Sequence, residues 1–315
     1  MTIPFLPALP EGNFSTLDEG LNLDTISYLG CLAAKVTSAN FEQSLDFLQD
    51  VVARFGTNVS VQLDVTELDA PQDIVALLDA GAGKVFATLS QLKQLDPVKN
   101  IDPERLVLYI TNERSESKDA IIEAVGDTTV DLYFHEVKDV TRIQDFLRLY
   151  GDERPAVYVS LDETVFPSPK DAYISLIKSS AIPVIPASTL SVEKESTPET
   201  IPVSSLLNID SDRPDGLIAT VVTNESGVAL GLVYSSPESI QESLRTGRGV
   251  YQSRKRGLWY KGESSGDIQE LIGVSLDCDH DCVKFIVRQK GRGMARVYST
   301  FEGETVLTCN KGSVT

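Results

Sequence analysis

Residues 59–89 read VSVQLDVTELDAPQDIVALLDAGAGKVFATL, and this stretch contains the unit from which the fold of the first half of the chain can be predicted. It begins with an apolar run, Val59–Val65, and ends with a second one, Lys84–Leu89. Between them, Pro71 stands where the first turn of a helix is expected, and Gly81 stands where that helix ends. A strand, a helix and a second strand in this order predict parallel pairing with a helical crossover.

The same alternation of strand-like runs and helical patterns extends from about residue 26 to residue 187. Apolar residues in Asn40–Phe55 recur at spacings of three and four, and Gly56 supplies a stop, so a helix is expected there. The other five of the seven expected strands are Ile26–Val36, Leu106–Ile110, Val130–Val137, Ala156–Leu161 and Ile182–Pro186. Residues 1–188 are therefore expected to form an α/β domain, either a degenerate β/α barrel or a doubly wound sheet. We favour the barrel, although an eighth strand is not evident.

The polar side chains of this first domain give no convincing catalytic set. Asp64 and Asp162 stand near the carboxyl ends of predicted strands, where acidic residues commonly cap the following helix. His135 stands next to Glu136 within a predicted strand, and we interpret it as a structural residue. No function can be read from the sequence of residues 1–188.

A second domain is expected after a linker. Residues 189–212 are rich in Ser, Glu, Thr and Pro and have no sustained periodicity, which predicts the linker. In residues 213–315 a helix is expected with Ser236 as its N-cap, Pro237 at its first position and Gly247 at its end. Strands are expected at Gly216–Thr223, Val228–Tyr234, Gly249–Ser253, Gly257–Lys261, Ile268–Leu276 and Cys282–Gln289. This pattern predicts a small β-rich α+β domain.

Charge and cysteine content argue against several classes of protein. The chain carries 46 acidic and 28 basic residues, and its net charge of −18 repels phosphate backbones, so no nucleic acid partner is expected. A phosphorylated substrate would need a local basic site or bound cations. Residues 1–12 contain no basic residue, and no stretch approaches the roughly 20 apolar residues of a membrane span, so neither a signal peptide nor a membrane partner is expected. The four cysteines lack the spacing of a secreted disulfide scaffold, which favours reduced thiols in the cytoplasm.

The densest cluster of possible metal ligands is residues 277–282, which read DCDHDC. In an extended backbone, side chains alternate between two faces, so the three aspartates would share one face and the cysteines and histidine the other. Three like charges on one face favour a bound cation, and carboxylate oxygens suit Mg²⁺ or Ca²⁺. Cysteine and histidine suit Zn²⁺. The alternative interpretation is an acidic turn with two ordinary thiols.

Two segments upstream of this cluster concentrate basic, hydroxyl and glycine residues. They read SRKR at residues 253–256 and KGESSG at residues 261–266. Cations would supply charge to a phosphate group, and hydroxyls and glycine amides would supply hydrogen bonds. The segments therefore form a candidate phosphate site, and the alternative is a solvated basic turn between strands.

Three blocks of the second domain occur in a specific order and spacing. They are TGRGVYQSR at residues 246–254, LWYKGESSG at 258–266 and DCDHD at 277–281, accompanied by RPDGL at 213–217 and LGLVYS at 230–235. Together they resemble the signature of the phosphoribosyl-AMP cyclohydrolase family over residues 213–293. The preceding β/α region is similar to the amino-terminal part of the fungal trifunctional histidine-biosynthesis proteins, in layout and in pieces such as LDAGA at residues 78–82.

The resemblance implies a metal-dependent hydrolase of histidine biosynthesis. The family opens the purine ring of phosphoribosyl-AMP, a phosphorylated nucleotide, at the N1–C6 bond and works as a homodimer with Zn²⁺ and Mg²⁺. The implied magnesium ligands are Asp277, Asp279 and Asp281, and the implied zinc ligand is Cys278. The implied catalytic residues are Cys278 and Glu263, and the implied substrate-binding residues are Arg254, Trp259, Lys261, Ser264 and Ser265.

The pattern of the family is lost after Gly293. Ala295 stands where the resemblance leads us to expect a second zinc cysteine, and no histidine accompanies it. A catalytic zinc site normally has three protein ligands and a water molecule. This loss, followed by the end of the chain at Thr315, leads to the hypothesis of a truncated or mis-assembled gene product. The alternative to an active enzyme is a catalytically impaired or non-enzymatic scaffold without a complete zinc site.

Overall fold

A computed structural model of the chain describes residues 3–11, 14, 21–95, 101–111, 130–150, 155–193, 200–209, 211, 213–277, 280–291, 297–299 and 305–307. The chain divides into two compact units, residues 2–208 and residues 209–315. The boundary between them falls inside the predicted linker, residues 189–212. None of the described helices is long and apolar enough to span a membrane.

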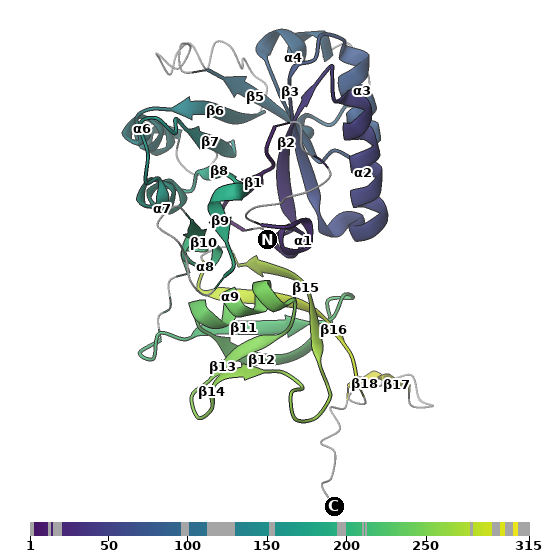
Figure 1. Cartoon of the computed structure of the whole chain (residues 1–315), viewed down its shortest axis with the longest axis vertical. Coiled ribbons are helices and arrows are strands. Elements are labelled where there is room, and N and C mark those ends of the chain that lie inside the picture. Colours follow the sequence, from purple (N-terminus) through teal and green to yellow (C-terminus); the bar gives the residue numbers. More distant parts are fainter. Residues whose placement is uncertain are drawn as a thin grey trace, which may run out of the picture. The chain divides into compact units, whose positions relative to one another are not determined.

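The first unit is a closed barrel of parallel strands with helices around it (Figure 1). Its strands are β1 (Leu6–Ala8), β2 (Cys31–Thr37), β3 (Ser60–Glu67), β4 (Lys84–Ala87), β5 (Leu106–Ile110), β6 (Asp131–Val137), β7 (Val157–Leu161) and β8 (Ile182–Pro186). Its longer helices are α1 (Leu23–Leu29), α2 (Phe41–Phe55), α3 (Pro71–Asp79), α4 (Leu89–Leu95), α6 (Val140–Tyr150) and α7 (Lys170–Lys178). The predicted α/β class is confirmed, and the barrel is the correct one of the two expected architectures.

The eighth strand, β1, closes the barrel and was not expected from the sequence. Leu6 pairs with Val184 of β8, and Ala8 pairs with Ala33 of β2. The strand is three residues long and contains Pro7, which cannot donate to a strand ladder. Because it is this short, it has no alternation that could distinguish it from a proline-rich terminus.

The strand expected at Ile26–Val36 begins too early, because its first residues form the end of α1. Asn22 caps this helix by accepting a hydrogen bond from the backbone N–H of Thr25 at 2.8 Å. Gly30 ends the helix with a φ of 76°, a conformation that glycine adopts without a steric penalty. Strand β2 then starts at Cys31.

The predicted helix-capping roles of Asp64 and Asp162 are wrong. Asp64 lies within β3, and its carboxylate accepts hydrogen bonds from the N–H and the hydroxyl of Thr66, at 3.0 and 2.7 Å. Asp162 follows β7 and accepts the same pair of bonds from Thr164, at 2.9 and 2.5 Å. Asp64 therefore bonds within its own strand and Asp162 stabilises a turn after β7, and in both cases the next helix starts several residues later.

Short elements occupy part of the predicted linker. They are a 3₁₀ turn (Ala187–Thr189), strands β9 (Leu190–Ser191) and β10 (Ile201–Pro202), and helix α8 (Val203–Leu206). Leu190, Val203 and Leu206 are fully buried. These residues therefore pack as part of the first unit.

The second unit contains a four-stranded sheet in the order β12-β11-β16-β15, a two-stranded hairpin and one helix. These elements are β11 (Ile218–Thr223), β12 (Ala229–Ser235), α9 (Pro237–Thr246), β13 (Val250–Ser253), β14 (Gly257–Tyr260), β15 (Gln269–Leu276) and β16 (Cys282–Gln289). A further pair, β17 (Val297–Ser299) and β18 (Thr305–Leu307), follows them. The predicted β-rich α+β class is confirmed.

Helix α9 has the boundaries that its sequence predicts. Ser236 and Ser239 exchange hydrogen bonds in a capping box, and Pro237 occupies the first helical position. Gly247 ends the helix with a φ of 63°. The helix buries Ile240 and Leu244 in the core of the second unit.

Candidate functional site

The basic segment 253–256 is the turn of the β13–β14 hairpin. Ser253 pairs with Gly257, and the turn projects the charged side chains between them. The guanidinium of Arg254 is 3.4 Å from the carboxylate of Asp215 and 5.4 Å from the ring centre of Tyr234. Arg254 is therefore held near the end of β12 by an ion pair and an aromatic ring.

A pocket of about 330 Å³ lies beside this turn. Its lining includes Tyr234, Tyr251, Gln252, Lys255, Arg256 and Trp259. The guanidinium of Arg256 lies 5.7 Å from the ring centre of Trp259. Aromatic rings suit a planar base, and two cations suit a phosphate, so the pocket matches a phosphorylated nucleotide in chemistry.

Among the substrate-binding residues expected from the sequence, Trp259 lines this pocket and Arg254 lies next to it. Lys255 and Arg256 belong to the predicted phosphate segment 253–256, whereas Tyr251 was in no predicted site. The register of the hairpin carries the missing signal, because Tyr251 pairs directly with Trp259 and their rings are 6.0 Å apart. Paired residues of neighbouring strands point to the same face, so a hairpin prediction could have placed both rings together.

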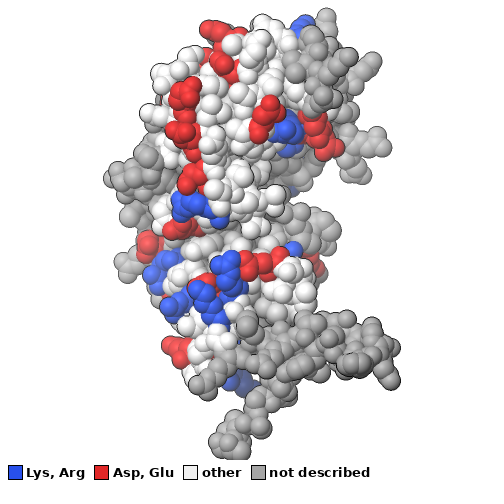
Figure 2. Space-filling model, turned by 90° about the vertical axis from the view of Figure 1, so that its right-hand side faces the viewer, with Lys and Arg blue, Asp and Glu red and all other residues white. Residues whose placement is uncertain are grey.

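The second unit is less acidic than the chain as a whole. Residues 209–315 contain 13 basic and 14 acidic residues, whereas residues 1–208 contain 15 basic and 32 acidic residues. Figure 2 shows the basic side chains gathered on the visible face of the second unit. The local basic environment that a phosphorylated substrate requires is therefore available in this unit in spite of the net charge of −18.

Glu242 is a buried acid of α9 that the sequence reasoning missed. Glu242 is 2% exposed, and its carboxylate accepts two hydrogen bonds from the guanidinium of Arg245, at 2.7 and 2.9 Å. The hydroxyl of Tyr260 donates a further hydrogen bond to it, and this bond raises the pKa of Tyr260. Glu242 thus ties α9 to the end of β14, immediately before Lys261. The only sequence signal is its spacing of three from Arg245.

The turn 262–266 has a backbone that requires glycine. Gly262 has a φ of 87°, and a Cβ atom there would lie 2.4 Å from the backbone carbon of Asp267. The residues expected in the substrate site, Glu263, Ser264 and Ser265, are exposed on this turn. Lys261 precedes the turn, and its backbone N–H donates to the carbonyl of Gly249 at 3.0 Å.

Strands β15 and β16 are antiparallel with Leu276 opposite Val283, so the chain reverses between them and the expected extended backbone with two alternating faces is wrong. Asp277 accepts a hydrogen bond from the N–H of Cys282 at 3.1 Å, which closes the turn. His280 has a φ of 62°, in the left-handed region. Asp281 is exposed, and Cys278 and Asp279 lie outside the described residues. The alternation argument fails because the chain reverses direction within this segment.

The two turns lie at opposite ends of β15. Gln269 pairs with Gln289 at the end next to the turn 262–266, and Leu276 pairs with Val283 at the end next to the turn 277–281. The strand has 8 residues, and the seven steps of about 3.3 Å between its first and last residues separate its ends by about 23 Å. In one chain, Glu263 is therefore remote from the acidic turn.

Arg254 lies toward the same end of the sheet as the acidic turn. Its ion-pair partner Asp215 comes just before β11, and β11 runs parallel to β16 with Ala219 opposite Cys282. The structure therefore brings Arg254 and Trp259 together around the pocket and places Asp277 and Asp281 at the same end of the sheet. It does not bring Lys261, Glu263, Ser264 or Ser265 to that end.

The carboxylates of Asp277 and Asp281, between β15 and β16, are of the type that binds magnesium. Mg²⁺ is commonly bound by one or two carboxylates together with substrate phosphates and water, and Asp277 and Asp281 supply oxygen atoms of this type. Zinc needs three protein ligands, and the described residues contain no group of three or more His, Cys, Asp or Glu side chains that could hold a metal ion. Cys282 is a free thiol, and burial raises its pKa, which disfavours the thiolate that zinc binds.

Comparisons of the chain with a family sequence model and with individual proteins agree with each other. Residues 231–296 match the sequence model of the family described as phosphoribosyl-AMP cyclohydrolase. The chain is 38% identical to the histidine biosynthesis trifunctional protein of Neurospora crassa over 297 residues, which cover 93% of this chain and 32% of that protein. It is 35% identical to the histidine biosynthesis bifunctional protein his7 of Schizosaccharomyces pombe over 306 residues, 93% of this chain and 69% of that protein.

A bacterial relative matches the second unit alone. The phosphoribosyl-AMP cyclohydrolase of Roseobacter denitrificans is 44% identical over 78 residues, which cover 24% of this chain and 61% of that protein. The chain thus spans about a third of the length of the Neurospora protein and about two thirds of the Schizosaccharomyces protein.

Proposed function

Because the chain belongs to the family of fungal histidine-biosynthesis proteins with a phosphoribosyl-AMP cyclohydrolase domain, we propose that it hydrolyses the N1–C6 bond of the purine ring of phosphoribosyl-AMP. The single observation that carries the proposal is the pocket of aromatic and basic residues within the matched region. A nucleotide with phosphate groups offers a planar base to the aromatic rings of this pocket and negative charge to its basic side chains. We place the proposed reaction in the cytoplasm.

The pocket holds the substrate through two kinds of contact. The purine ring stacks on Trp259, and the phosphate groups approach Lys255 and Arg256. Arg254, which stands next to the pocket, contributes a further positive charge. Such contacts orient the ring for attack by water and exclude bulk solvent from one of its faces.

The hydrolysis step adds water to C6. A new C6–O bond forms, the C6–N1 bond breaks, and N1 receives a proton, so that one water molecule is consumed. Glu263 is the proposed general base that takes the proton from the attacking water, because it is an exposed carboxylate within the matched region. Lys261, Ser264 and Ser265 complete the substrate contacts around it.

This assignment requires a homodimer. About 23 Å separates the two ends of β15, so within one chain Glu263 lies far from the proposed magnesium ligands at the other end of the strand. In a symmetric dimer, the turn 262–266 of one copy can complete the pocket of the other. Leu232 of β12, which is 65% exposed and pairs with Val221 of β11, is a candidate contact between the two copies.

Metal dependence is part of the proposal. Asp277 and Asp281, with Asp279 from outside the described residues, are the proposed magnesium ligands, and Mg²⁺ when bound offsets the charge of substrate phosphates. Cys278 is the proposed zinc ligand and catalytic residue. Because the described residues of one chain do not supply a three-ligand zinc set, no step is assigned to zinc.

The experiment is ring opening of phosphoribosyl-AMP by the purified chain, followed chromatographically with and without added Mg²⁺ and Zn²⁺. We expect turnover that depends on metal and falls when Arg256 is replaced by Ala. The matched control is Arg288→Ala, because Arg288 is an exposed arginine of the same unit that pairs with Glu225 away from the pocket. Equal activity of the two variants would contradict the assignment of the pocket.

A non-enzymatic scaffold is the second candidate function. The observation that favours it is Ala295, at the position where the resemblance leads us to expect a zinc cysteine. No turnover by the folded chain with both metals present, together with binding of Mg²⁺ without zinc, would select this candidate over the enzyme.

A further inference from the structure

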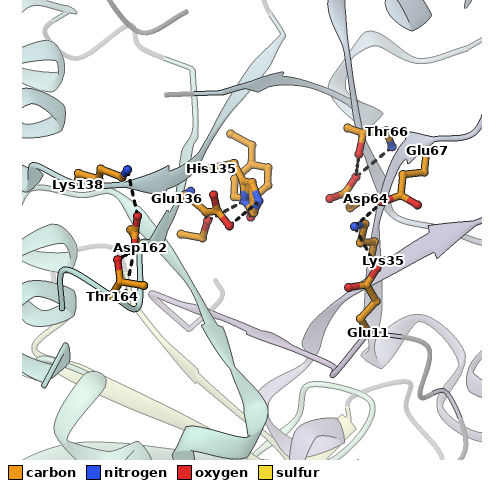
Figure 3. A network of polar contacts seen from close by, with 12 residues as sticks. Glu11, Lys35, Asp64, Thr66, Glu67, His135, Glu136, Lys138, Asp162 and Thr164 are labelled. Carbon is orange, nitrogen blue, oxygen red and sulfur yellow. Dashed lines mark hydrogen bonds and ion pairs between the residues drawn. The ribbon is translucent and has the colours of Figure 1, made fainter. Parts of the chain in front are cut away.

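Networks of side-chain hydrogen bonds and ion pairs occur in both units. The labelled residues of the network in Figure 3, from Glu11 to Thr164, belong to the first unit and lie outside the region 231–296 that matches the family model. A second network joins Tyr251, Gln269 and Gln289 within that region, and one of its members lines the pocket. The second network therefore bears directly on what the pocket binds.

Tyr251 forms the floor of the pocket. It is one of the lining residues although it is only 1% exposed, so it belongs to the base of the pocket rather than to its rim. The centre of its ring is 6.0 Å from that of Trp259 and 5.7 Å from that of Phe285, a fully buried residue of β16. Trp259, on which the purine ring is proposed to stack, therefore packs against a ring that also contacts the core.

The hydroxyl of Tyr251 is anchored by Gln269. It donates a hydrogen bond of 2.7 Å to the side-chain oxygen of Gln269, which is 5% exposed. Burial raises the pKa of Tyr251, so the hydroxyl keeps its proton and remains a donor. A buried hydroxyl without an acceptor is unfavourable unless water reaches it. Loss of Gln269 would therefore favour movement of the ring toward the pocket, where water is present.

Gln289 determines which way the amide of Gln269 faces. The side-chain nitrogen of Gln289 donates to the backbone carbonyls of Ile268 and Lys290, at 3.4 and 3.5 Å. A carbonyl oxygen can only accept, so the side-chain oxygen of Gln289 is left to accept from the nitrogen of Gln269, at 3.0 Å. The oxygen of Gln269 then faces Tyr251.

Gly249 leaves the space that this contact occupies. A Cβ atom at this position would lie 2.8 Å from the hydroxyl oxygen of Tyr251 and 2.9 Å from the side-chain oxygen of Gln269. Its backbone N–H also donates to the carbonyl of Gln269, at 2.8 Å. The φ of Gly249 is outside the left-handed region, so its backbone conformation does not require glycine. What excludes a side chain here is the bond between Tyr251 and Gln269.

We propose that Gln269 is a positioning residue of the pocket, because its side-chain oxygen holds Tyr251, and thereby Trp259, in the arrangement that binds the purine ring. The inference rests on the proposed function, which assigns the purine ring to this pocket. Gln269 is not among the lining residues of the pocket, so it acts through the ring of Tyr251.

The test measures by calorimetry the binding of AMP, which supplies a purine ring, a ribose and one phosphate, to the full chain. Gln269→Met keeps the length of the side chain but removes the acceptor for Tyr251, and we expect it to raise the Kd for AMP by about tenfold. The matched control is Gln91→Met in the first unit, where Gln91 is 7% exposed and its side-chain nitrogen donates to two backbone carbonyls at 2.8 and 2.7 Å. The control loses a buried glutamine outside the pocket, so its Kd should change by less than about twofold. Equal Kd values for the two variants would overturn the proposal.

Removal of the other partner tests whether the two residues act as a pair. Tyr251→Phe keeps the ring without its hydroxyl, and we expect it to raise the Kd for AMP by about threefold or more. The double variant should bind AMP no more weakly than Gln269→Met alone, because both changes break the same bond. Single effects that multiply in the double variant would contradict the pairing. If Gln269→Met does not fold, Tyr251→Phe decides alone, since an unchanged Kd would show that the bond does not set the pocket.

The kinetics of ring opening separate this inference from the proposed function. Gln269→Met should raise the KM for phosphoribosyl-AMP by about tenfold and change kcat by less than about twofold, because the purine ring is held in the ground state and the transition state alike. An unaltered chain that opens the ring, with an unchanged KM in Gln269→Met, would overturn the role of Gln269 alone. An unaltered chain that binds AMP but opens no ring would refute the proposed function, whereas the expected Kd values would still support the role of Gln269. Absence of AMP binding by the unaltered chain would overturn that role.

Discussion

Replacement of Glu242 by Ala tests how the second unit holds its helix against the hairpin. The carboxylate is buried and receives two hydrogen bonds from Arg245 and one from Tyr260. Removal of one partner of a buried ion pair costs about 3–5 kcal/mol. Arg245 is 33% exposed, so water can solvate its guanidinium after the change, and we expect the lower figure, about 3 kcal/mol.

The assay is urea unfolding of the chain, followed by the fluorescence of Trp259, its single tryptophan. With a slope of about 2 kcal/mol per molar urea, a loss of about 3 kcal/mol lowers the midpoint by about 1.5 M. The control is Glu238→Ala, an exposed acid in the first turn of the same helix, which should cost about 1 kcal/mol or less. If both variants unfold at the same urea concentration, the buried network around Glu242 contributes nothing and the reasoning is refuted.

The same network predicts a dependence of stability on pH. The hydrogen bond to Glu242 raises the pKa of Tyr260 above its usual value of about 10, so the protonated hydroxyl is favoured in the folded state. Its contribution is present below the pKa of the unfolded chain and is lost as the pH rises through the pKa of the folded state. Glu242→Gln should reduce this loss of stability in alkaline solution, and an unchanged profile would contradict the link.

Substitutions in the pocket, in the turn 262–266 and at the proposed metal ligands have further expected effects. Trp259→Ala should raise the KM for phosphoribosyl-AMP by about tenfold or more with an intact fold, and an unchanged KM would show that the base does not stack there. Gly262→Ala should destabilise the second unit by more than about 1 kcal/mol, because its Cβ would meet the backbone of Asp267 at 2.4 Å; an unchanged unfolding midpoint would contradict this geometry. Cys278→Ala should abolish turnover and Asp279→Asn should weaken the dependence on Mg²⁺, which steady-state rates across a range of metal concentrations can check; full activity of both variants would remove the metal assignments.

The fold was predictable wherever several local signals agreed. For α9, the cap at Ser236, the proline at its first position and the glycine at its end all mark the same boundaries, and the structure has them there. Strand β16 likewise has the predicted limits, because its buried and half-buried residues alternate. Strand β1 could not be predicted, because its three residues are fixed by pairing with β2 and β8 rather than by their own pattern.

The site was predictable in part, and the failures have physical causes. The three aspartates of residues 277–281 were expected to share a face if the backbone were extended, but the chain reverses between β15 and β16, and Asp277 accepts a hydrogen bond from the N–H of Cys282. The partner of a buried carboxylate such as Glu242 depends on long-range packing, which spacing along one helix does not reveal. The sequence also placed the blocks 253–256 and 261–266 in one phosphate site, whereas they lie at opposite ends of the β13–β14 hairpin.

We propose that substrate is held by the pocket of one chain and attacked with the help of Glu263 from another. The most direct measurement mixes two inactive variants, Arg256→Ala and Glu263→Gln, after dissociation and reassociation of their subunits. Random pairing gives mixed dimers in which one of the two pockets is intact on both sides, so the mixture should recover about a quarter of the activity of the unaltered protein. A mixture that stays inactive, although size-exclusion chromatography shows mixed dimers, would contradict the shared site.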